Sequence, residues 1–493
     1  MKISTCTIIL SFFIYTSLWF PLSKSTNHQQ SLESANHLIL FRKRIIQIAL
    51  HDALRLQSTM NTYHVSSGCA WCDCLVALED AIFRLNTTLN SYGQTSSAAT
   101  DIEAQTWLSA TLTNLHTCRG LGFSYNSNDI YNDASNSILD AFAVFNKDSS
   151  SSTFTYSGAD QFEHQKLLDH SKVDLVVAQD GSGDFKTIQS AVNFVASKRK
   201  QLLGNDHCNR IVIYVKAGRY HENVRIARHQ NNITMFGEGI GRTIVTGNRS
   251  VQGGSTTFDS ATFAIRGDGF IGKNMSIQNT AGASMGQAVA LRSGSDESAF
   301  YKCSFEGYQD TLYVHSNRQF FRDCTIYGSV DFIFGNAAVL FQNCEIYVRT
   351  NSFHSFNTIT AQGRDDPHQN SGIVVHNSQV LLAQPTSNNT SPTKTYLGRP
   401  WQKYSRTVFI KTYMGSLIDP AGWLAWGDDS VLRTLFYGEY HNTGPGSTTS
   451  GRVSWPGFHL LSNSSQVECF TVENFISGLI WLPSTGIPFT SSL

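Results

Sequence analysis

The chain has 493 residues, of which 41% are hydrophobic and 15% charged, and its 37 basic and 37 acidic residues cancel to a net charge of zero. This hydrophobic content excludes a wholly disordered chain, and the neutral charge argues against a dedicated nucleic-acid-binding protein. The charge is unevenly divided. Residues 1–172 hold 11 basic and 14 acidic residues, a net of −3, whereas residues 173–493 hold 26 and 23, a net of +3. The second part is therefore better suited to a polyanionic partner.

Residues 1–25 have the layout of a secretory signal peptide. Lys2 precedes an apolar stretch at residues 8–20, which is shorter than the ~20 residues of a membrane-spanning helix. An uncleaved signal anchor is the alternative. We expect a secreted, extracellular protein without stable membrane association, and its glycosylation sequons agree with export. They begin at Asn86, Asn232, Asn248, Asn274, Asn388, Asn389 and Asn463.

Residues 26–150 are predicted to form an all-α four-helix bundle. Apolar residues recur at helical spacing in four stretches, for example Tyr131, Ala134, Ile138 and Phe142, and the separators are short and polar. The following segment, residues 151–172, is polar and begins with serines, which predicts a linker.

From residue 173 onward the pattern changes to short β-branched runs divided by Gly and Asn, which predicts strands. Three of these runs repeat, and their cysteines, Cys303, Cys324 and Cys344, lie 21 and 20 residues apart. A period of this length without helices predicts the coils of a parallel β-helix, and the leucine lattice of leucine-rich repeats is missing. Residues 173–493 are thus predicted to be an all-β parallel β-helix.

The repeating cysteines would stack inside the β-helix as small apolar fillers. A disulfide between Cys303 and Cys324 is the alternative, because export leads to an oxidising compartment. The early pair Cys69 and Cys72 has metal-ligand spacing, but no second pair or histidine cluster completes a zinc site. We therefore expect no metal.

Four polar residues share the period of the repeat. Asp310 and Asp331 lie 21 residues apart and Gln287 and Gln309 lie 22 apart, so they fall on three consecutive coils of one face. Two stacked carboxylates do not both ionise readily; one pKa rises and the other falls, which separates an acid from a nucleophile. The two amides can donate hydrogen bonds to a developing oxyanion. This pattern predicts acyl transfer; the alternative is a pair of Asp residues that only cap turns.

A cation is needed to keep one of the two Asp residues ionised. Arg399 is the candidate, because Pro400 restricts the backbone beside it and Trp401 supplies a neighbouring aromatic ring.

Seven stretches of residues 173–490 resemble plant pectin methylesterases (pectinesterases) and occur in the family's order. They are residues 181–189, 218–222, 286–291, 308–313, 330–335, 397–401 and 437–440. The resemblance implies a right-handed parallel β-helix that removes methyl esters from homogalacturonan during plant cell wall modification. It implies no cofactor.

The resemblance also implies a role for each candidate residue. Asp331 would be the nucleophile, and Asp310 would protonate the leaving methanol and then activate water. Gln287 and Gln309 would hold the oxyanion, and Arg399 would fix and ionise Asp331. The substrate would be contacted by Trp401, Gln287 and Arg399.

Residues 26–150 resemble the inhibitor-like pro-domain of such enzymes, through residues 73–80 and 106–110. The resemblance implies a disulfide between Cys74 and Cys118. Two features depart from the family: residues 26–60 contain no cysteine, and the processing site retains only Lys166 of a basic pair before Leu167-Leu168. Inhibition and cleavage therefore stay open. The expected partners are methyl-esterified homogalacturonan and a proteinaceous pectinesterase inhibitor, and we expect a monomer.

Two other functions are compatible with parts of the pattern. One is a β-helix polysaccharide lyase or hydrolase, although the two Gln residues favour neither. The other is a non-catalytic inhibitor or binding protein that acts through the helical domain.

Overall fold

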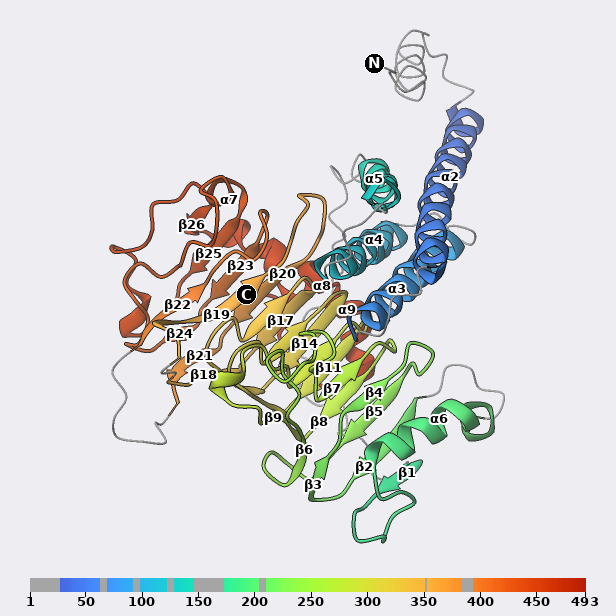
Figure 1. Cartoon of the computed structure of the whole chain (residues 1–493). Coiled ribbons are helices and arrows are strands. Elements are labelled where there is room, and N and C mark those ends of the chain that lie inside the picture. The colour runs from blue at the N-terminus through green and yellow to red at the C-terminus, as the bar shows by residue number, and fades with distance from the viewer. Residues whose placement is uncertain are drawn as a thin grey trace.

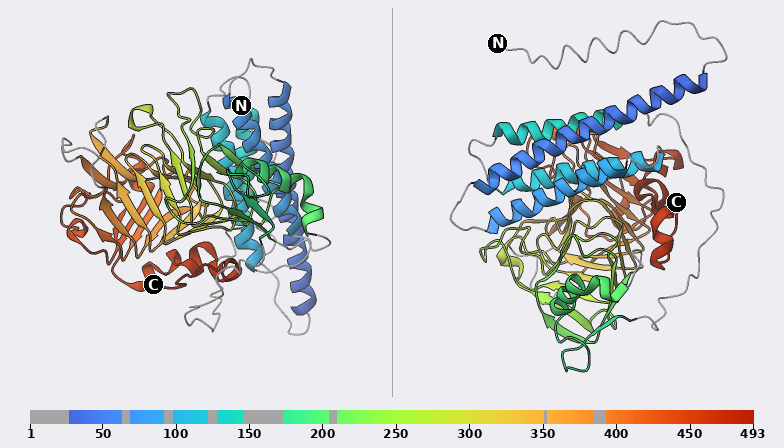
Figure 2. Two further views of the ribbon diagram at one scale, coloured as in Figure 1. Left: turned by 90° about the horizontal axis from the view of Figure 1, so that it is seen from below. Right: turned by 90° about the vertical axis from the view of Figure 1, so that its right-hand side faces the viewer.

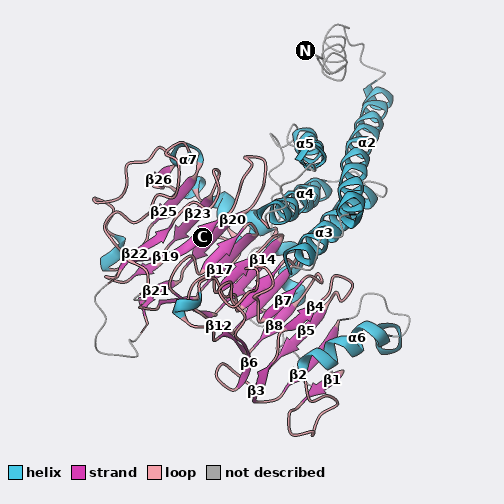
Figure 3. Cartoon of the chain, in the orientation of Figure 1, coloured by secondary structure: helices cyan, strands magenta, loops and turns pink. Residues whose placement is uncertain are grey.

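The computed structural model describes residues 27–62, 69–91, 98–121, 128–145, 173–203, 210–350, 353–383 and 393–493. The expected signal peptide, the linker at residues 151–172 and the processing site at Lys166 lie outside the described residues. In the described part, four long helices precede a large body of parallel strands (Figures 1 and 3).

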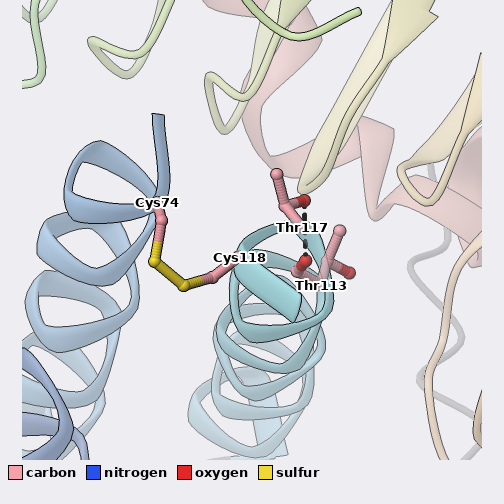
Figure 4. Close-up of a disulfide and its surroundings, with 4 residues drawn as sticks. All are labelled: Cys74, Thr113, Thr117 and Cys118. Atoms are coloured by element: carbon pink, nitrogen blue, oxygen red, sulfur yellow. Dashed lines mark hydrogen bonds between the residues drawn. A yellow bond between two sulfur atoms is a disulfide. The ribbon is translucent and has the colours of Figure 1, made fainter. Parts of the chain in front are cut away.

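The four N-terminal helices form the predicted all-α bundle. Their buried faces share one hydrophobic core, which includes Ile46, Leu78, Leu108 and Ile138. A disulfide joins Cys74 to Cys118, the pair that the family resemblance implies, and ties the second of these helices to the third (Figure 4). The helices are α2 (Asn27–Thr62), α3 (Cys69–Ser91), α4 (Ala98–Gly120) and α5 (Asn128–Phe145).

The strands form a parallel β-helix of three sheets, in which each coil adds one strand to each sheet in turn. The seven-stranded sheet consists of β4 (Val224–Ile226), β7 (Phe263–Ile265), β10 (Leu291–Ser293), β13 (Leu312–Val314), β16 (Ile333–Gly335), β19 (Phe356–Gln362) and β22 (Lys394–Gly398). The eight-stranded sheet consists of β3 (Gly218–His221), β6 (Thr243–Gly247), β9 (Ser276–Asn279), β12 (Ser304–Glu306), β15 (Thr325–Gly328), β18 (Glu345–Val348), β21 (Gln379–Leu382) and β24 (Tyr413–Met414). The eleven-stranded sheet consists of β1 (Leu175–Val177), β2 (Ile211–Val215), β5 (Ile233–Phe236), β8 (Ile271–Lys273), β11 (Ser298–Tyr301), β14 (Arg318–Arg322), β17 (Ala338–Gln342), β20 (Gly372–His376), β23 (Arg406–Ile410), β25 (Phe436–Tyr440) and β26 (Phe458–Leu460).

The cysteine repeat forms an interior column, as the periodicity predicts. Cys303, Cys324 and Cys344 are buried and free, so the alternative disulfide between Cys303 and Cys324 is not formed. Each cysteine follows a residue in the left-handed region; Asp323, for example, has a φ of 51°. A single residue of this kind turns the chain sharply between two strands, and Asn, Asp and Gly tolerate it best. The Asn and Asp residues between the repeats therefore set the corners of the coils.

Helices cover the N-terminal end and one side of the β-helix. The helix α6 packs against β1, β2 and β4, and α8 and α9 contribute Val472, Ile476 and Trp481 to a core outside the eleven-stranded sheet. The helices are α6 (Ile188–Leu203), α7 (Val431–Thr434), α8 (Val472–Ile476) and α9 (Gly478–Trp481), and the 3-10 turns are η3 (Ala283–Met285), η4 (Pro445–Ser447), η5 (Ser464–Gln466), η6 (Glu468–Phe470) and η7 (Leu482–Thr485).

The helical bundle lies along one side of the β-helix, with α3 and α4 nearest to it (Figure 2). Val76 of α3 packs against a cluster that includes Ala264 and Tyr313 of the seven-stranded sheet. Arg84 of α3 forms two hydrogen bonds with Asp268, of 2.9 and 2.5 Å, and is fully buried. The indole of Trp107 on α4 donates to Asp296 over 3.1 Å. The two parts thus bury polar groups against each other, and this contact places α4 over the region that holds the predicted site.

Candidate active site

The two predicted carboxylates lie on adjacent coils of the seven-stranded sheet. Leu312 pairs with Ile333, so Asp310 and Asp331, each two residues earlier, occupy equivalent positions. Both are in the left-handed region, with φ of 62° and 49°, and the backbone N–H of Asp310 donates to the carbonyl of Val330 over 3.0 Å. The repeat period therefore brings the two side chains to one place, as the sequence predicts.

Asp331 is held by a dense set of donors. Arg399 donates through Nε to Oδ1 over 2.8 Å and through Nη2 to Oδ2 over 2.5 Å, and the Thr358 hydroxyl donates to Oδ1 over 2.6 Å. The guanidinium of Arg399 lies 3.9 Å from the ring centroid of Trp426. Paired, charge-assisted hydrogen bonds of this kind fix the orientation of the carboxylate.

Asp310 has a different electrostatic environment from Asp331, because burial and a neighbouring negative charge disfavour its ionised form. Its side chain is buried, and burial raises its pKa well above the usual range, with a further increase from the negative charge of Asp331 that Arg399 only partly offsets. A buried neutral carboxylic acid can donate a proton, which its ionised neighbour cannot. The pair therefore presents one acid and one carboxylate.

The two glutamines reach the same place with an offset of one residue. The N–H of Ala288 donates to the carbonyl of Gln309 over 3.2 Å, so Gln309 is level with Ala288 rather than with Gln287. Both Gln side chains are half-buried, and neither side-chain amide has a hydrogen-bond partner within the described ranges. Their N–H groups are therefore free to donate to a ligand.

These side chains line one cavity of about 530 Å³, a volume typical of small-ligand sites. Its aromatic wall consists of Tyr313 stacked on Phe334, with ring centroids 4.3 Å apart, and of Trp401, whose centroid lies 5.9 Å from that of Phe334. Trp401 is 39% exposed. The structure thus brings together all six residues predicted for catalysis and substrate contact: Gln287, Gln309, Asp310, Asp331, Arg399 and Trp401.

The helix α4 forms one side of the cavity. Thr117 is 2.9 Å from Nε2 of His315, and Asn336 donates to the hydroxyl of Thr113 over 2.9 Å. Figure 4 shows Thr113 and Thr117 on the side of α4 turned away from the disulfide. His116 and Gly120 of α4 and Leu121, which directly follows the helix, also line the cavity.

Sequence reasoning missed three contributors to this site. Thr358 follows Asp331 by 27 residues, because a longer coil interrupts the period of about 21, so spacing gave no indication of it. Trp426 belongs to no repeat, and its stacking on Arg399 has no sequence pattern. His315 lies buried in the cavity wall, and no motif or spacing in the sequence indicates it.

Neither a metal cluster nor a membrane span was found in the part of the chain that the structure describes. No group of three or more His, Cys, Asp or Glu side chains there could hold a metal ion. Similarly, none of the described helices combines the length and the hydropathy needed to cross a bilayer.

Comparison with known proteins assigns the two parts of the chain. The pectinesterase model matches residues 174–479, and the model for plant invertase/pectin methylesterase inhibitor matches residues 22–155. These matches correspond to the right-handed parallel β-helix and to the helical bundle. The chain belongs to the pectinesterase family and is an ester hydrolase with an inhibitor-like domain in the same chain.

Individual relatives agree with this assignment. Pectinesterase 2 of Citrus sinensis is 50% identical over 469 residues, covering 92% of this chain and 88% of the relative. Probable pectinesterase/pectinesterase inhibitor 17 of Arabidopsis thaliana is 50% identical over 441 residues, covering 86% and 81%. The solved pectin methylesterase from carrot is 48% identical with a TM-score of 0.63, and the match covers 67% of this chain and 100% of the carrot chain.

Proposed function

We propose that this chain hydrolyses the methyl esters of homogalacturonan in the plant cell wall, releasing methanol and leaving free galacturonate. One observation supports the proposal most directly. The carboxylate of Asp331, which accepts hydrogen bonds of 2.5 and 2.8 Å from Arg399, lies beside the buried carboxyl group of Asp310, whose pKa is raised. One side chain is thus prepared to attack a carbonyl carbon and the other to protonate the leaving oxygen.

In the first half of the reaction, an Oδ atom of Asp331 attacks the carbonyl carbon of the methyl ester. The oxyanion that develops accepts hydrogen bonds from the side-chain amides of Gln287 and Gln309. Asp310 gives its proton to the methoxy oxygen, the carbon–oxygen bond breaks, and methanol leaves. The galacturonyl group is then joined to Asp331 as an anhydride.

In the second half, Asp310 is a carboxylate and accepts a proton from a water molecule. The water oxygen attacks the galacturonyl carbonyl, the bond to Asp331 breaks, and the free acid leaves. Asp331 is again ionised and Asp310 again carries a proton. Trp401, Tyr313 and Phe334 supply an aromatic surface on which a sugar ring can pack.

Methanol and chain length, measured on the same sample, test the proposal. Highly methylated pectin incubated with residues 173–493 is expected to release methanol while the polymer keeps its length. Shortened or unsaturated oligosaccharides without methanol would instead support a β-helix hydrolase or lyase.

The two glutamines should matter mainly for the transition state. Gln309→Ala is expected to lower kcat for methanol release by roughly 10²–10³-fold, the usual effect of losing one oxyanion donor, with a small change in KM. Gln287→Ala should behave similarly. Steady-state kinetics with methylated pectin check this, and a loss confined to KM would contradict it.

The raised pKa of Asp310 predicts the basic limb of the pH profile. The reaction begins with a proton on Asp310, which is retained below its folded-state pKa and lost above it, so kcat/KM should fall as the pH rises through that value. Because burial and Asp331 raise this pKa, the decline should lie well above the ordinary range of an aspartate. The profile of residues 173–493 checks this; a decline that coincides only with unfolding contradicts it.

We further propose the domain division of the chain and its destination. Residues 1–25 are a secretion signal, residues 26–150 an inhibitor-like bundle, residues 151–172 a linker and residues 173–493 the esterase, acting as an extracellular monomer in the cell wall. Because α4 forms a side of the cavity, the bundle restrains the esterase within the same chain. The absence of cysteines in residues 26–60 does not prevent this, since α2 packs into the bundle core through Ile46 and Leu56.

A further inference from the structure

Thr358 lies on the coil next to the proposed nucleophile, at the equivalent position. Ile333 of β16 pairs with Thr360 of β19, so Asp331 and Thr358, each two residues earlier, are level with each other on adjacent coils. The coil before contributes Asp310 to the same column of side chains. Asp331 therefore lies between the carboxyl group of Asp310 and the hydroxyl group of Thr358.

The hydroxyl group of Thr358 forms two hydrogen bonds with Asp331. It donates to Oδ1 over 2.6 Å and accepts from the backbone N–H of Asp331 over 2.9 Å. On the coil before, the N–H of Asp310 donates instead to a backbone carbonyl, that of Val330. Thr358 is fully buried and does not line the cavity. One side chain behind the cavity thus holds both the backbone and the carboxylate of Asp331.

The donors around Asp331 leave one acceptor position of its carboxylate free. A carboxylate offers about four such positions, two on each oxygen. Among the described residues, Oδ1 accepts from Thr358 and from Nε of Arg399, whereas Oδ2 accepts only from Nη2 of Arg399. Both positions on Oδ1 are therefore filled, and the free lone pair, which can attack a carbonyl carbon, is on Oδ2.

We propose that Thr358 is a positioning residue that occupies Oδ1 of Asp331, so that Oδ2 attacks the methyl ester. This inference rests on the proposed esterase function. A lone pair of Oδ2 forms the bond to the carbonyl carbon, and the π electrons of the carbonyl group move onto its oxygen. When they return, the bond to the methoxy oxygen breaks, and that oxygen takes the proton of Asp310. Oδ1 becomes a carbonyl oxygen of the anhydride and keeps its hydrogen bond from Thr358.

The esterase domain, residues 173–493, is suitable for the test. Its interior forms a hydrophobic core separate from that of the bundle, and the carrot structure matches over its full length with 67% of this chain. In this domain, Thr358→Val removes the hydroxyl group and keeps the branched shape of the side chain. Thr358→Ser keeps the hydroxyl group and removes only a methyl group.

The matched control is Thr360→Val, on the same strand. Thr360 is as fully buried as Thr358, and its hydroxyl group donates to the carbonyl of Leu397 over 2.9 Å. It does not line the cavity and forms no hydrogen bond with Asp331. Thr358→Val and Thr360→Val each remove one buried hydroxyl group, so a difference between their activities reports on the contact with Asp331.

The readouts are kcat and KM for methanol release from methylated pectin, together with the melting temperature. We expect Thr358→Val to lower kcat by about 10- to 100-fold, because a nucleophile without a fixed orientation spends less time in the reactive geometry. The KM should change by less than about twofold, since Thr358 does not reach the cavity. Thr358→Ser should restore kcat to within about threefold of the parent, and Thr360→Val should keep it within about twofold.

A crystal structure tests which oxygen attacks. Asp310→Asn has nearly the shape of the neutral acid but no acidic proton, so a methylated oligogalacturonide bound to it should persist. The carbonyl carbon of its ester should lie about 3–3.5 Å from Oδ2 of Asp331 and farther from Oδ1. A carbonyl carbon nearer to Oδ1 would overturn the inference. This structure also decides the question if Thr358→Val does not fold.

The kinetic outcomes separate this inference from the esterase proposal. Equal kcat for Thr358→Val and Thr360→Val would overturn the inference, and so would a Thr358→Ser variant as slow as Thr358→Val. In both cases the esterase proposal would stand, because methanol release by the parent domain is measured in the same assay. A parent domain that releases no methanol would instead overturn the esterase proposal, and this inference with it.

Discussion

Asp331→Asn in residues 173–493 is expected to reduce methanol release from methylated pectin by at least ~10⁴-fold, as loss of a covalent nucleophile does elsewhere. The amide has almost the same shape as the carboxylate but neither its charge nor its nucleophilicity. Arg399 would keep its position against Trp426 without its anionic partner. The loss should therefore appear in kcat rather than in substrate binding.

A turn aspartate provides the matched control for this variant. Asp323 adopts the same left-handed conformation, with a φ of 51°, and pairs with Arg322 at 3.0 Å, but it does not line the cavity. Asp323→Asn should retain the parent rate within about twofold, since surface ion pairs contribute little. Equal rates for Asp331→Asn and the parent would exclude Asp331 as the nucleophile.

Removal of the helical bundle is expected to raise kcat/KM on polymeric pectin by about 100-fold or more relative to the full chain. A side of the cavity is formed by α4, and a bundle that is docked in 99% of molecules would leave about 1% active. The comparison requires the full chain, residues 26–493, and residues 173–493 assayed at equal concentration.

A single substitution in the full chain should give part of the same effect. Arg84 is fully buried against Asp268, and Arg84→Ala leaves the partly buried carboxylate of Asp268 without its cation, which should weaken docking by up to about 3 kcal/mol. The control is Arg55→Ala, because Arg55 pairs with Asp133 within the bundle and is exposed. Two results would contradict the proposal that the bundle restrains the esterase. One is that Arg55→Ala activates the full chain as much as Arg84→Ala does, and the other is that the full chain and the esterase domain are equally active.

The sequence predicts the architecture well, because the coils of the β-helix repeat at a nearly constant interval along the chain. The 20- and 21-residue intervals between Cys303, Cys324 and Cys344 correspond to coils of the β-helix. The same period aligns Asp310 with Asp331. The period places Gln287 only approximately, since the interval from Gln287 to Gln309 is one residue longer than the interval from Asp310 to Asp331. Arg399 and Trp401 lie outside the 21-residue intervals, so spacing does not place them. The residues beside Arg399 favour it as the cation, whereas only the family resemblance indicates the role of Trp401.

The contacts between the two domains could not be predicted from the sequence. Each domain has its own hydrophobic periodicity and its own core, and the pairing of Asp80 with Arg228 and Arg266 joins residues 148 and 186 positions apart. Such pairs have no period, and a charged residue on a helix face usually indicates only a solvated surface. The cavity wall from α4 was missed for the same reason.

A trapping experiment tests most directly whether ester hydrolysis passes through a covalent bond to Asp331. The anhydride has two carbonyl groups, and hydroxylamine can attack either one. During turnover of methylated pectin by residues 173–493, we expect galacturonyl hydroxamate in the product and a hydroxamate on Asp331 in the peptide mass spectrum. Both should require substrate and should be absent in Asp331→Asn. Methanol release at the parent rate with neither hydroxamate, at any hydroxylamine concentration, would contradict the covalent mechanism.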